Sequence, residues 1–290
     1  MKIENVFVAG CGTMGNGIAQ ACAQSGYTVT MYDISADGLQ KAMGTIKKSI
    51  TKLVEKELVS GTVDEILGRI QPTEQAEAAA DADLIIEAVF EKIEIKNDLF
   101  AKLNPVIRDT TIVGSNTSGL TISQMAAATK RPENFLGLHF FNPVPLMKAV
   151  EVIKGITTSE TTFQTGKAFV ESLGKEPILV TRDIAGFVLN RINMLTNMEA
   201  MRLVENNVAT PEDIDKGACL AFGRKMGPLE TSDLVGLDVQ LMAYTNVYEE
   251  EKDLRFYPPS ILRRKVAAGH LGRKTGIGWY EYNADGSRKK

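Results

Sequence analysis

The sequence predicts an α/β protein in which a doubly wound sheet domain, residues 1–184, precedes an all-α C-terminal domain, residues 185–290. Two observations lead to this prediction. Short runs of β-branched and aromatic residues alternate with amphipathic segments as far as residue 182, which is typical of a parallel sheet with helices on both faces. After Asp183 the pattern becomes almost wholly helical.

The strands expected in the first domain are short apolar runs. They span residues 5–10, 27–33, 81–89, 111–118, 134–141, 150–155 and 177–182. The helices expected among them carry apolar residues along one side. They span residues 12–26, 35–59, 91–104 and 159–173. Because strands alternate with helices, the sheet is expected to be parallel.

The second domain is expected to consist of helices separated by breaks at residues 227–228 and 258–259. Thr210 before Pro211 is typical of a capped helix start. One apolar helix face is predicted from residues at helical spacing, which are Ile192, Leu195, Met198 and Leu203. A weak strand, GWYEY, is expected near the C-terminus.

The composition excludes several classes of protein. A net charge of -3 over 290 residues gives no surface for nucleic acid, which requires concentrated basic charge. No apolar run approaches the roughly 18–20 residues of a membrane span, and the N-terminus does not resemble a signal peptide. The three cysteines are odd in number and lack metal-ligand spacing, so a cytoplasmic protein without a metal is expected.

A glycine-rich turn follows the first expected strand. Gly10, Gly12 and Gly15 have the G-x-G-x-x-G spacing, and the second strand ends at Asp33, eighteen residues after Gly15. A strand, this turn, a helix and a second strand ending in an acidic residue are the context of a Rossmann-type dinucleotide-binding domain. Gly10 permits the tight turn, Gly12 lets a pyrophosphate approach the backbone, and Gly15 lets helix and strand pack closely.

The same region favours NAD(H) over NADP(H). The helix start offers free N–H groups and a positive dipole end to phosphates. Asp33 can accept hydrogen bonds from ribose hydroxyls, and with Ile34 and Ser35 after it instead of an arginine, its charge would repel a 2′-phosphate. The candidate cofactor-binding residues here are Gly10, Gly12, Thr13, Met14, Gly15 and Asp33. A glycine-rich turn beside a surface aspartate is the purely structural alternative.

One of only two histidines, His139, lies in the apolar run GLHFF. A loop with Pro143 and Pro145 follows and leads to Glu151, a carboxylate between two valines. Histidine titrates near neutral pH, so it can accept the proton of a hydroxyl group while hydride leaves the carbon. Glu151 could orient the ring and stabilise its imidazolium form if the two strands are neighbours. A core histidine beside a surface glutamate is the alternative.

Six stretches are similar to the short-chain L-3-hydroxyacyl-CoA dehydrogenases, in particular to stand-alone bacterial members of butyrate-type metabolism. They are VAGCGTMGNGIAQ, LIIEAVFEKIEIKNDLF, SNTSGLTI, GLHFFNPVPLMKAVEVI, DIAGFVLNR and MGPLETSDLVGLD, and the resemblance covers nearly the whole chain. Cys11 departs from the family, which usually has alanine there. The resemblance implies a helical domain for substrate binding and dimerisation, and a homodimer or a dimer of dimers.

The resemblance also implies an activity. It is the NAD-dependent interconversion of (S)-3-hydroxybutyryl-CoA, or another short-chain 3-hydroxyacyl-CoA, and acetoacetyl-CoA in butyrate or fatty-acid metabolism. On this basis His139 is the catalytic base and Glu151 the carboxylate that orients it. Ser118 and Asn190 match the residues that hold the reacting substrate, and CoA is expected in the cleft between the domains.

Further positions match contacts of the family. Those on the nicotinamide side are Glu91, Lys96, Ser118 and Asn142, and Asn116 is a further candidate for cofactor binding. Those that contact CoA are Ser49 and Lys56. Four residues have an alternative reading. Ser118 could cap a helix starting near Leu120, and Asn190 could lie on an exposed helix face. Lys56 could be solvated, and Lys96, two positions after Glu94, could be ordinary helix charge.

Two other functions are weighed. A non-catalytic NAD-binding relative is disfavoured because the four candidate catalytic residues occur together. A dehydrogenase of small hydroxy acids without CoA usually needs an arginine for the substrate carboxylate. Arg108 and Arg131 both fall outside the predicted site, so this second reading is weaker.

Overall fold

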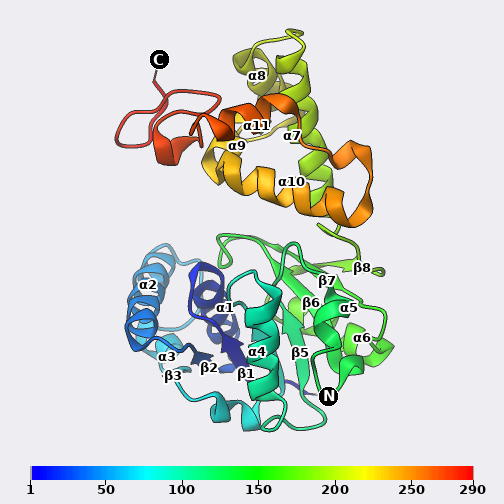
Figure 1. Ribbon diagram of the computed structural model, residues 1–290. Helices are drawn as coiled ribbons and strands as arrows, with labels where there is room; N and C mark the ends of the chain where they lie inside the picture. Colours follow the sequence, from blue (N-terminus) through cyan, green and yellow to red (C-terminus); the bar gives the residue numbers. More distant parts are fainter. Residues whose placement is uncertain (1, 290) are drawn as a thin grey trace. The chain divides into compact units, whose positions relative to one another are not determined.

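The structure, a computed structural model, describes residues 2–289. It divides into two compact units, Met1–Phe187 and Val188–Lys290. The first is an α/β unit and the second is helical, which confirms the predicted fold class (Figure 1). Within residues 2–289, no helix combines the length and the apolar character needed to cross a membrane.

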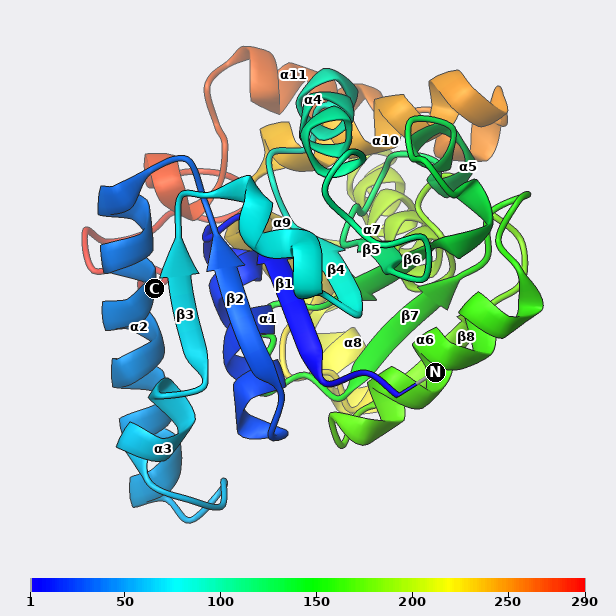
Figure 2. The same cartoon turned by 90° about the horizontal axis from the view of Figure 1, so that it is seen from below.

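An eight-stranded sheet forms the centre of the first unit, in the order β3-β2-β1-β4-β5-β6-β7-β8. The strands are β1 (Asn5–Ala9), β2 (Thr28–Tyr32), β3 (Ile70–Thr73), β4 (Leu84–Glu87), β5 (Ile112–Ser115), β6 (Phe135–Phe140), β7 (Ala149–Ile153) and β8 (Glu176–Val180). Strands β1 to β6 pair in parallel, and Figure 2 shows β1, β2 and β3 side by side. The strand order reverses between β1 and β4, where doubly wound sheets bind ligands.

Helices cover both faces of this sheet. One core contains residues of α1 (Thr13–Gln24), α2 (Ala36–Glu55) and α6 (Glu160–Ser172) together with Val6 and Val8 of β1. Successive strand residues point to opposite faces, so Phe7 faces the other layer. That layer includes α4 (Ile93–Leu103) and α5 (Ile122–Ala126); Phe100 of α4 packs edge-on against Phe135 of β6, with ring centroids 5.4 Å apart.

One edge of the sheet departs from the predicted parallel arrangement. β7 pairs antiparallel with β6, and β8 pairs in parallel with β7. The cause is the short connection between Phe140 and Ala149, which has no helix, because a parallel crossover needs a dozen or more residues. The antiparallel register places His139 directly opposite Glu151.

Other elements of the first unit differ from the prediction. β3, which the pattern did not predict, has the sequence IQPT and lies at the sheet edge, where a proline is tolerated. The helix predicted for residues 35–59 ends at Glu55, and a separate short helix, α3 (Val63–Leu67), follows. The strands predicted for 81–89 and 111–118 are shorter, because their last residues lie in the segments that follow the carboxyl ends of β4 and β5.

The second unit contains α7 (Leu189–Glu205), α8 (Pro211–Phe222), α9 (Pro228–Val235), α10 (Leu237–Glu251) and α11 (Ser260–Ala267). The predicted cap is confirmed, because the Thr210 side chain accepts a hydrogen bond from the Asp213 amide at the start of α8. The predicted apolar face is confirmed at Met198, which is buried, and wrong at Ile192, which is 59% exposed. α7 also buries Met194 and Met201, which were not predicted.

The expected C-terminal strand GWYEY is also wrong. Residues 277–282 make only isolated bridges, and the segment is held by buried carboxylates instead. Asp233 accepts hydrogen bonds from the amides of Trp279 and Tyr280 and from the Tyr282 hydroxyl. Asp215 accepts one from the Tyr280 hydroxyl. Hydrogen bonds to side chains thus replace the ladder of a strand.

Candidate active site

The glycine turn after β1 has the features that a dinucleotide requires. Gly10 has φ +104°, and a Cβ on Gly15 would lie 1.8 Å from the Gly10 carbonyl oxygen, so both positions need glycine for the fold. A Cβ on Gly12 would meet nothing within 4 Å. Helix α1 starts at Thr13 without a side-chain cap, which leaves its first amides free for an anion. The open space and the uncapped helix start fit a pyrophosphate.

Asp33 connects the end of β2 to this turn. One carboxylate oxygen accepts a hydrogen bond from the Cys11 amide at 2.9 Å, and the other accepts one from the Ser35 amide at 3.1 Å. Burial, together with the nearby Asp33 carboxylate, raises the pKa of the Cys11 thiol to about 12. Cys11 is therefore a neutral thiol at physiological pH, and it adds no charge to the phosphate side of the turn.

His139 and Glu151 form a buried pair. Nδ1 of His139 lies 2.6 Å from Oε2 of Glu151, and the two side chains are 6% and 0% exposed. A carboxylate can only accept a hydrogen bond, so Nδ1 carries the proton and Nε2 is left to act on a ligand. The rings of Phe141 and Phe187 flank the imidazole, with centroids 4.5 and 5.6 Å away. The arrangement orients a single proton acceptor in an apolar setting.

The ends of β5 and β6 are joined beside this pair. The side-chain carbonyl of Asn116 accepts a hydrogen bond from the Phe140 amide at 2.9 Å, next to His139. The Asn116 amide in turn donates to the carbonyl of Glu87 at the end of β4. Asn116 therefore fixes backbone at three strand ends, in addition to any contact it makes with a cofactor.

A buried lysine holds the loop between His139 and Glu151. Nζ of Lys175 donates to the carbonyl oxygens of Val144 and Met147, both at 2.7 Å. Burial lowers the pKa of Lys175. The ammonium group ties the loop between β6 and β7 to the segment that joins α6 and β8.

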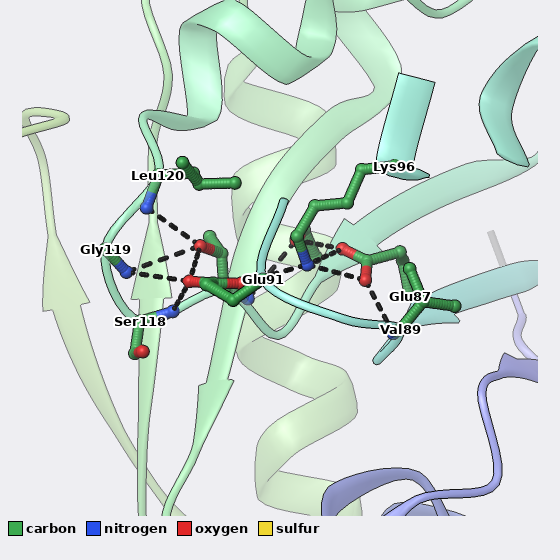
Figure 3. Close-up of polar contacts among 9 residues, drawn as sticks. Glu87, Val89, Glu91, Lys96, Ser118, Gly119 and Leu120 are labelled. Carbon is green, nitrogen blue, oxygen red and sulfur yellow. Dashed lines mark hydrogen bonds and ion pairs between the residues drawn. The ribbon is translucent and has the colours of Figure 1, made fainter. Parts of the chain in front are cut away.

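Glu91 and Lys96 belong to a cluster of charged side chains at the end of β4 (Figure 3). Nζ of Lys96 lies 2.7 Å from Oε1 of Glu87 and 3.1 Å from Oε2 of Glu91. Burial acts to raise the pKa of Glu91, but the Lys96 charge and hydrogen bonds from Thr117 and Ser118 outweigh it, so the pKa is lowered. The Lys96 ammonium group thus lies between the carboxylates of Glu87 and Glu91.

Ser118 lies in the exposed turn after β5, and its amide donates to Glu91. The alternative reading of Ser118 as a helix cap is wrong, because α5 starts at Ile122 and its N-cap residue is Thr121. The Ser118 side chain is thus not occupied by capping a helix, while its backbone is fixed.

Four candidates remain, on α2, on the loop after β6 and on α7. Ser49 and Lys56 lie on α2 and at its C-terminal end, and Lys56 is exposed. Asn142 is exposed on the loop after β6. Asn190 is half-buried in the first turn of α7, in the second unit.

Four polar residues near the site were given no individual role from the sequence: Glu87, Ser115, Thr117 and Lys175, although Glu87 and residues 115–118 were expected at strand ends. Glu87, Ser115 and Thr117 follow or end the apolar runs of β4 and β5, and that position at the carboxyl end of a strand is a usable signal. Lys175 gives no such signal, because a lysine after a helix is ordinarily solvated.

Arg108 and Arg131 are engaged elsewhere. Arg108 donates to Asp83 at 2.8 Å, and Arg131 donates to Asp109 at 2.9 Å. Both ion pairs are half-exposed. Neither arginine is free to bind the carboxylate of a small hydroxy acid.

Known proteins resemble the whole chain. Residues 5–184 match the family described as "3-hydroxyacyl-CoA dehydrogenase, NAD binding domain", and residues 186–282 match its C-terminal domain. A probable 3-hydroxybutyryl-CoA dehydrogenase of Deinococcus radiodurans is 43% identical over 95% of this chain and 99% of its own length. The human mitochondrial hydroxyacyl-coenzyme A dehydrogenase is 40% identical over 97% of this chain and 91% of its own. The crystal structure of the (S)-3-hydroxybutyryl-CoA dehydrogenase of Ralstonia eutropha, 40% identical, superposes with a TM-score of 0.94 over 97% of this chain and 100% of its own.

Proposed function

Because the chain belongs to the 3-hydroxyacyl-CoA dehydrogenase family, we propose that it interconverts (S)-3-hydroxybutyryl-CoA and acetoacetyl-CoA. The chain is an oxidoreductase of this family with NAD as cofactor. The four-carbon substrate is inferred from relatives named for it, which are 40–43% identical over nearly their full length. A place in butyrate or fatty-acid metabolism follows from that substrate.

The residues of the glycine turn suit the cofactor. The uncapped amides at the start of α1 would hold the pyrophosphate near Gly12, Thr13 and Met14. Asp33, at the end of β2, would accept hydrogen bonds from the adenosine ribose. When bound, NAD supplies the acceptor for hydride in oxidation and the donor in reduction. The cluster at the ends of β4 and β5, which includes Glu91 and Asn116, would lie on the nicotinamide side.

His139 is the proposed acid and base. Its Nδ1–H donates to Glu151, so Nε2 accepts the proton of the C3 hydroxyl group in oxidation and returns it in reduction. Glu151 keeps the ring in one tautomer and stabilises the imidazolium form. The apolar ring contacts of Phe141 and Phe187 exclude water from this pair.

Other residues would bind the substrate. Ser118 and Asn190 are proposed to hydrogen-bond the oxygen at C3 and hold it in a reactive orientation. Ser49 and Lys56 on α2 are proposed to contact CoA. The second unit is proposed to form a homodimer, or the dimer of a larger assembly, and exposed apolar side chains on α10 such as Met242 support this.

The observation that carries this proposal is the buried His139–Glu151 contact on neighbouring antiparallel strands of an NAD-binding unit. The test is oxidation of NADH in the presence of acetoacetyl-CoA, followed at 340 nm as a conventional assay. We expect turnover with acetoacetyl-CoA, a lower kcat/KM with longer 3-oxoacyl-CoA substrates, and a much lower rate with NADPH. Comparable turnover with free acetoacetate, or no turnover with any 3-oxoacyl-CoA, would contradict the proposal.

A further inference from the structure

The loop that joins β6 to β7, residues 141–148, packs on helix α1. Val144 is 2% exposed and belongs to the same hydrophobic core as Ile18 of α1. A Cβ on Gly17 of α1 would lie 3.0 Å from Cβ and 3.2 Å from Cγ2 of Val144, and 3.6 Å from Cδ of Pro145. The loop therefore approaches the backbone of α1 so closely that position 17 has little room for a side chain.

Gly17 is a glycine in the interior of a helix. It is buried in α1, and its φ does not lie in the left-handed region that favours glycine. Glycine inside a helix is less favourable than alanine, because it loses more conformational freedom on folding. The G-x-G-x-x-G spacing ends at Gly15 and does not account for it. The close approach of Val144 is a physical reason for a glycine at this position.

Lys175 holds the same loop from the segment before β8. Its Nζ donates to the carbonyl oxygens of Val144 and Met147, both at 2.7 Å, and the residue is 8% exposed. The amide of the next residue, Glu176, donates to the carbonyl of Lys148 at 2.9 Å. The backbone of the loop is thus held at its middle and at its end, while one of its side chains packs on α1.

The loop joins the two strands that carry the buried pair. β6 ends at Phe140, next to His139, and β7 begins at Ala149, two residues before Glu151. The ring of Phe141, the first residue of the loop, lies 4.5 Å from the His139 ring between centroids. The helix on which the loop packs begins with the uncapped amides proposed to hold the pyrophosphate. A shift of the loop against α1 would therefore move the proposed proton acceptor relative to the cofactor.

We propose that Gly17 and Lys175 are positioning residues that dock the 141–148 loop on α1 and so set the place of the His139 ring relative to the bound cofactor. The inference rests on the proposed function for the roles of His139 and of α1. It gives Gly17 a task separate from the glycine motif, and it gives Lys175 a task beyond stability. The chemical step depends on both residues more than binding does, because transfer of a proton and a hydride tolerates little misplacement.

Two variants disturb the docking from opposite sides. Lys175→Met removes both donors to the loop, and Gly17→Ala adds one carbon atom against Val144. Alanine favours a helix, so Gly17→Ala provides the test if Lys175→Met does not fold. The matched controls are Lys167→Met on α6, where the side chain is 38% exposed, and Gly44→Ala inside α2, where a Cβ would meet nothing within 4 Å.

The first test is NMR spectroscopy of the Nδ1 proton of His139 in the full-length protein without cofactor. We expect its 2.6 Å contact with Glu151 to shift this proton downfield and to slow its exchange with water. The chain has two histidines, so a His270→Gln variant assigns the signal. Exchange should be about tenfold faster or more in Lys175→Met, about threefold faster or more in Gly17→Ala, and within about twofold of wild type in the controls. Unchanged exchange in both variants overturns the proposal.

The second test is the kinetics of acetoacetyl-CoA reduction at saturating NADH. We expect kcat to fall by about tenfold or more in Lys175→Met and by about threefold or more in Gly17→Ala. The KM for acetoacetyl-CoA and the Kd for NADH should change by less than about twofold. A residue that only stabilised the fold would leave the kcat of the folded enzyme unchanged. An unchanged kcat in both variants, or a Kd for NADH that rises as much as kcat falls, overturns the proposal.

The two tests separate this inference from the proposed function. If His139→Gln keeps full kcat, the proposed acid and base is wrong, and the place of the ring has no catalytic purpose. NMR spectroscopy of the cofactor-free protein still decides whether Gly17 and Lys175 hold the buried pair, because it needs no activity.

Discussion

At the scale of single residues, two glycines of one motif have different tasks. Gly15 has no room for a Cβ, because the Gly10 carbonyl is in the way, whereas Gly12 faces open space and has φ -61°, which alanine adopts readily. Gly15 is required by the fold of the free protein. Gly12 is required only when something approaches the backbone from outside.

Gly12→Ala should therefore leave the melting temperature within a few degrees of wild type and weaken NADH binding by about tenfold or more. Gly15→Ala should instead lower the melting temperature or prevent folding, because the backbone must move. Fluorescence titration with NADH and thermal denaturation of both variants check this pair. Undiminished NADH affinity in Gly12→Ala would show that no pyrophosphate lies on this turn.

Glu91 makes the stability of its turn depend on pH. Its pKa is lower in the folded protein than in the unfolded chain, so its stabilising contribution is complete above the unfolded pKa of about 4.3 and disappears as pH falls through the folded value. Glu91→Gln should thus be less stable than the wild type near pH 6, and the difference in the free energy of unfolding should shrink as the pH falls below about 4. Chemical denaturation at several pH values measures it, and a difference that grows on acidification would contradict the assignment.

The role of a residue could be predicted from the sequence in two situations. One is a motif that fixes the backbone conformation, as for Gly12, and the other is a rare side chain in an apolar run, as for His139. The ion-pair partners of Lys96 could not be predicted from the sequence. The spacing of Glu94 and Lys96 reads as ordinary helix charge, and the partners of Lys96, Glu87 and Glu91, come from a strand end and a turn. The turn between β4 and α4 brings these partners to Lys96, and hydrogen bonds from Ser115 and Ser118 reach them because β4 and β5 are neighbours.

At the scale of elements, the loop between β6 and β7 determines whether His139 meets Glu151. It is anchored by the buried Lys175, whose ammonium group satisfies two loop carbonyls. Without that anchor the carbonyls of Val144 and Met147 lose their donor, and a buried acceptor without a partner is costly.

Lys175→Met should lower the free energy of unfolding of the protein by about 2–4 kcal/mol, because two buried carbonyls lose a charged donor. Lys167→Met is the control, since Lys167 on α6 makes only an exposed ion pair with Glu171 that contributes about 0.5 kcal/mol or less. Urea denaturation of both variants measures the difference. Equal stabilities would show that the loop needs no such anchor.

The order of strands and helices could be read from the sequence, because buried parallel strands are continuous apolar runs. β3 was not predicted, because Pro72 and two polar residues interrupt any apolar run in its sequence. An edge strand tolerates such residues. The direction of β7 is implicit in the length of the preceding loop, which is too short for a parallel crossover. GWYEY resembles a strand because aromatic residues are frequent in strands. In the structure these residues are buried, but the Asp233 carboxylate holds the segment in place of a neighbouring strand.

At the scale of the whole molecule, the proposed tasks are divided between two units. The cofactor residues and the His139–Glu151 pair belong to the first unit, whereas Asn190 belongs to the second. Asn190→Ala should therefore lower kcat/KM for acetoacetyl-CoA by about tenfold or more and leave the Kd for NADH within about twofold. Steady-state kinetics and NADH titration check this. A loss of NADH affinity equal to the loss of kcat/KM would contradict the division.

The most direct test of the account is the turnover of His139→Gln with acetoacetyl-CoA and saturating NADH, measured beside the Kd for NADH. Glutamine keeps a polar group in the same place but cannot exchange a proton near neutral pH. The account predicts that kcat falls by about 10²–10⁴-fold while the Kd for NADH changes by less than about twofold. Turnover close to that of the wild type would contradict it, because the proton would then be carried by some other group.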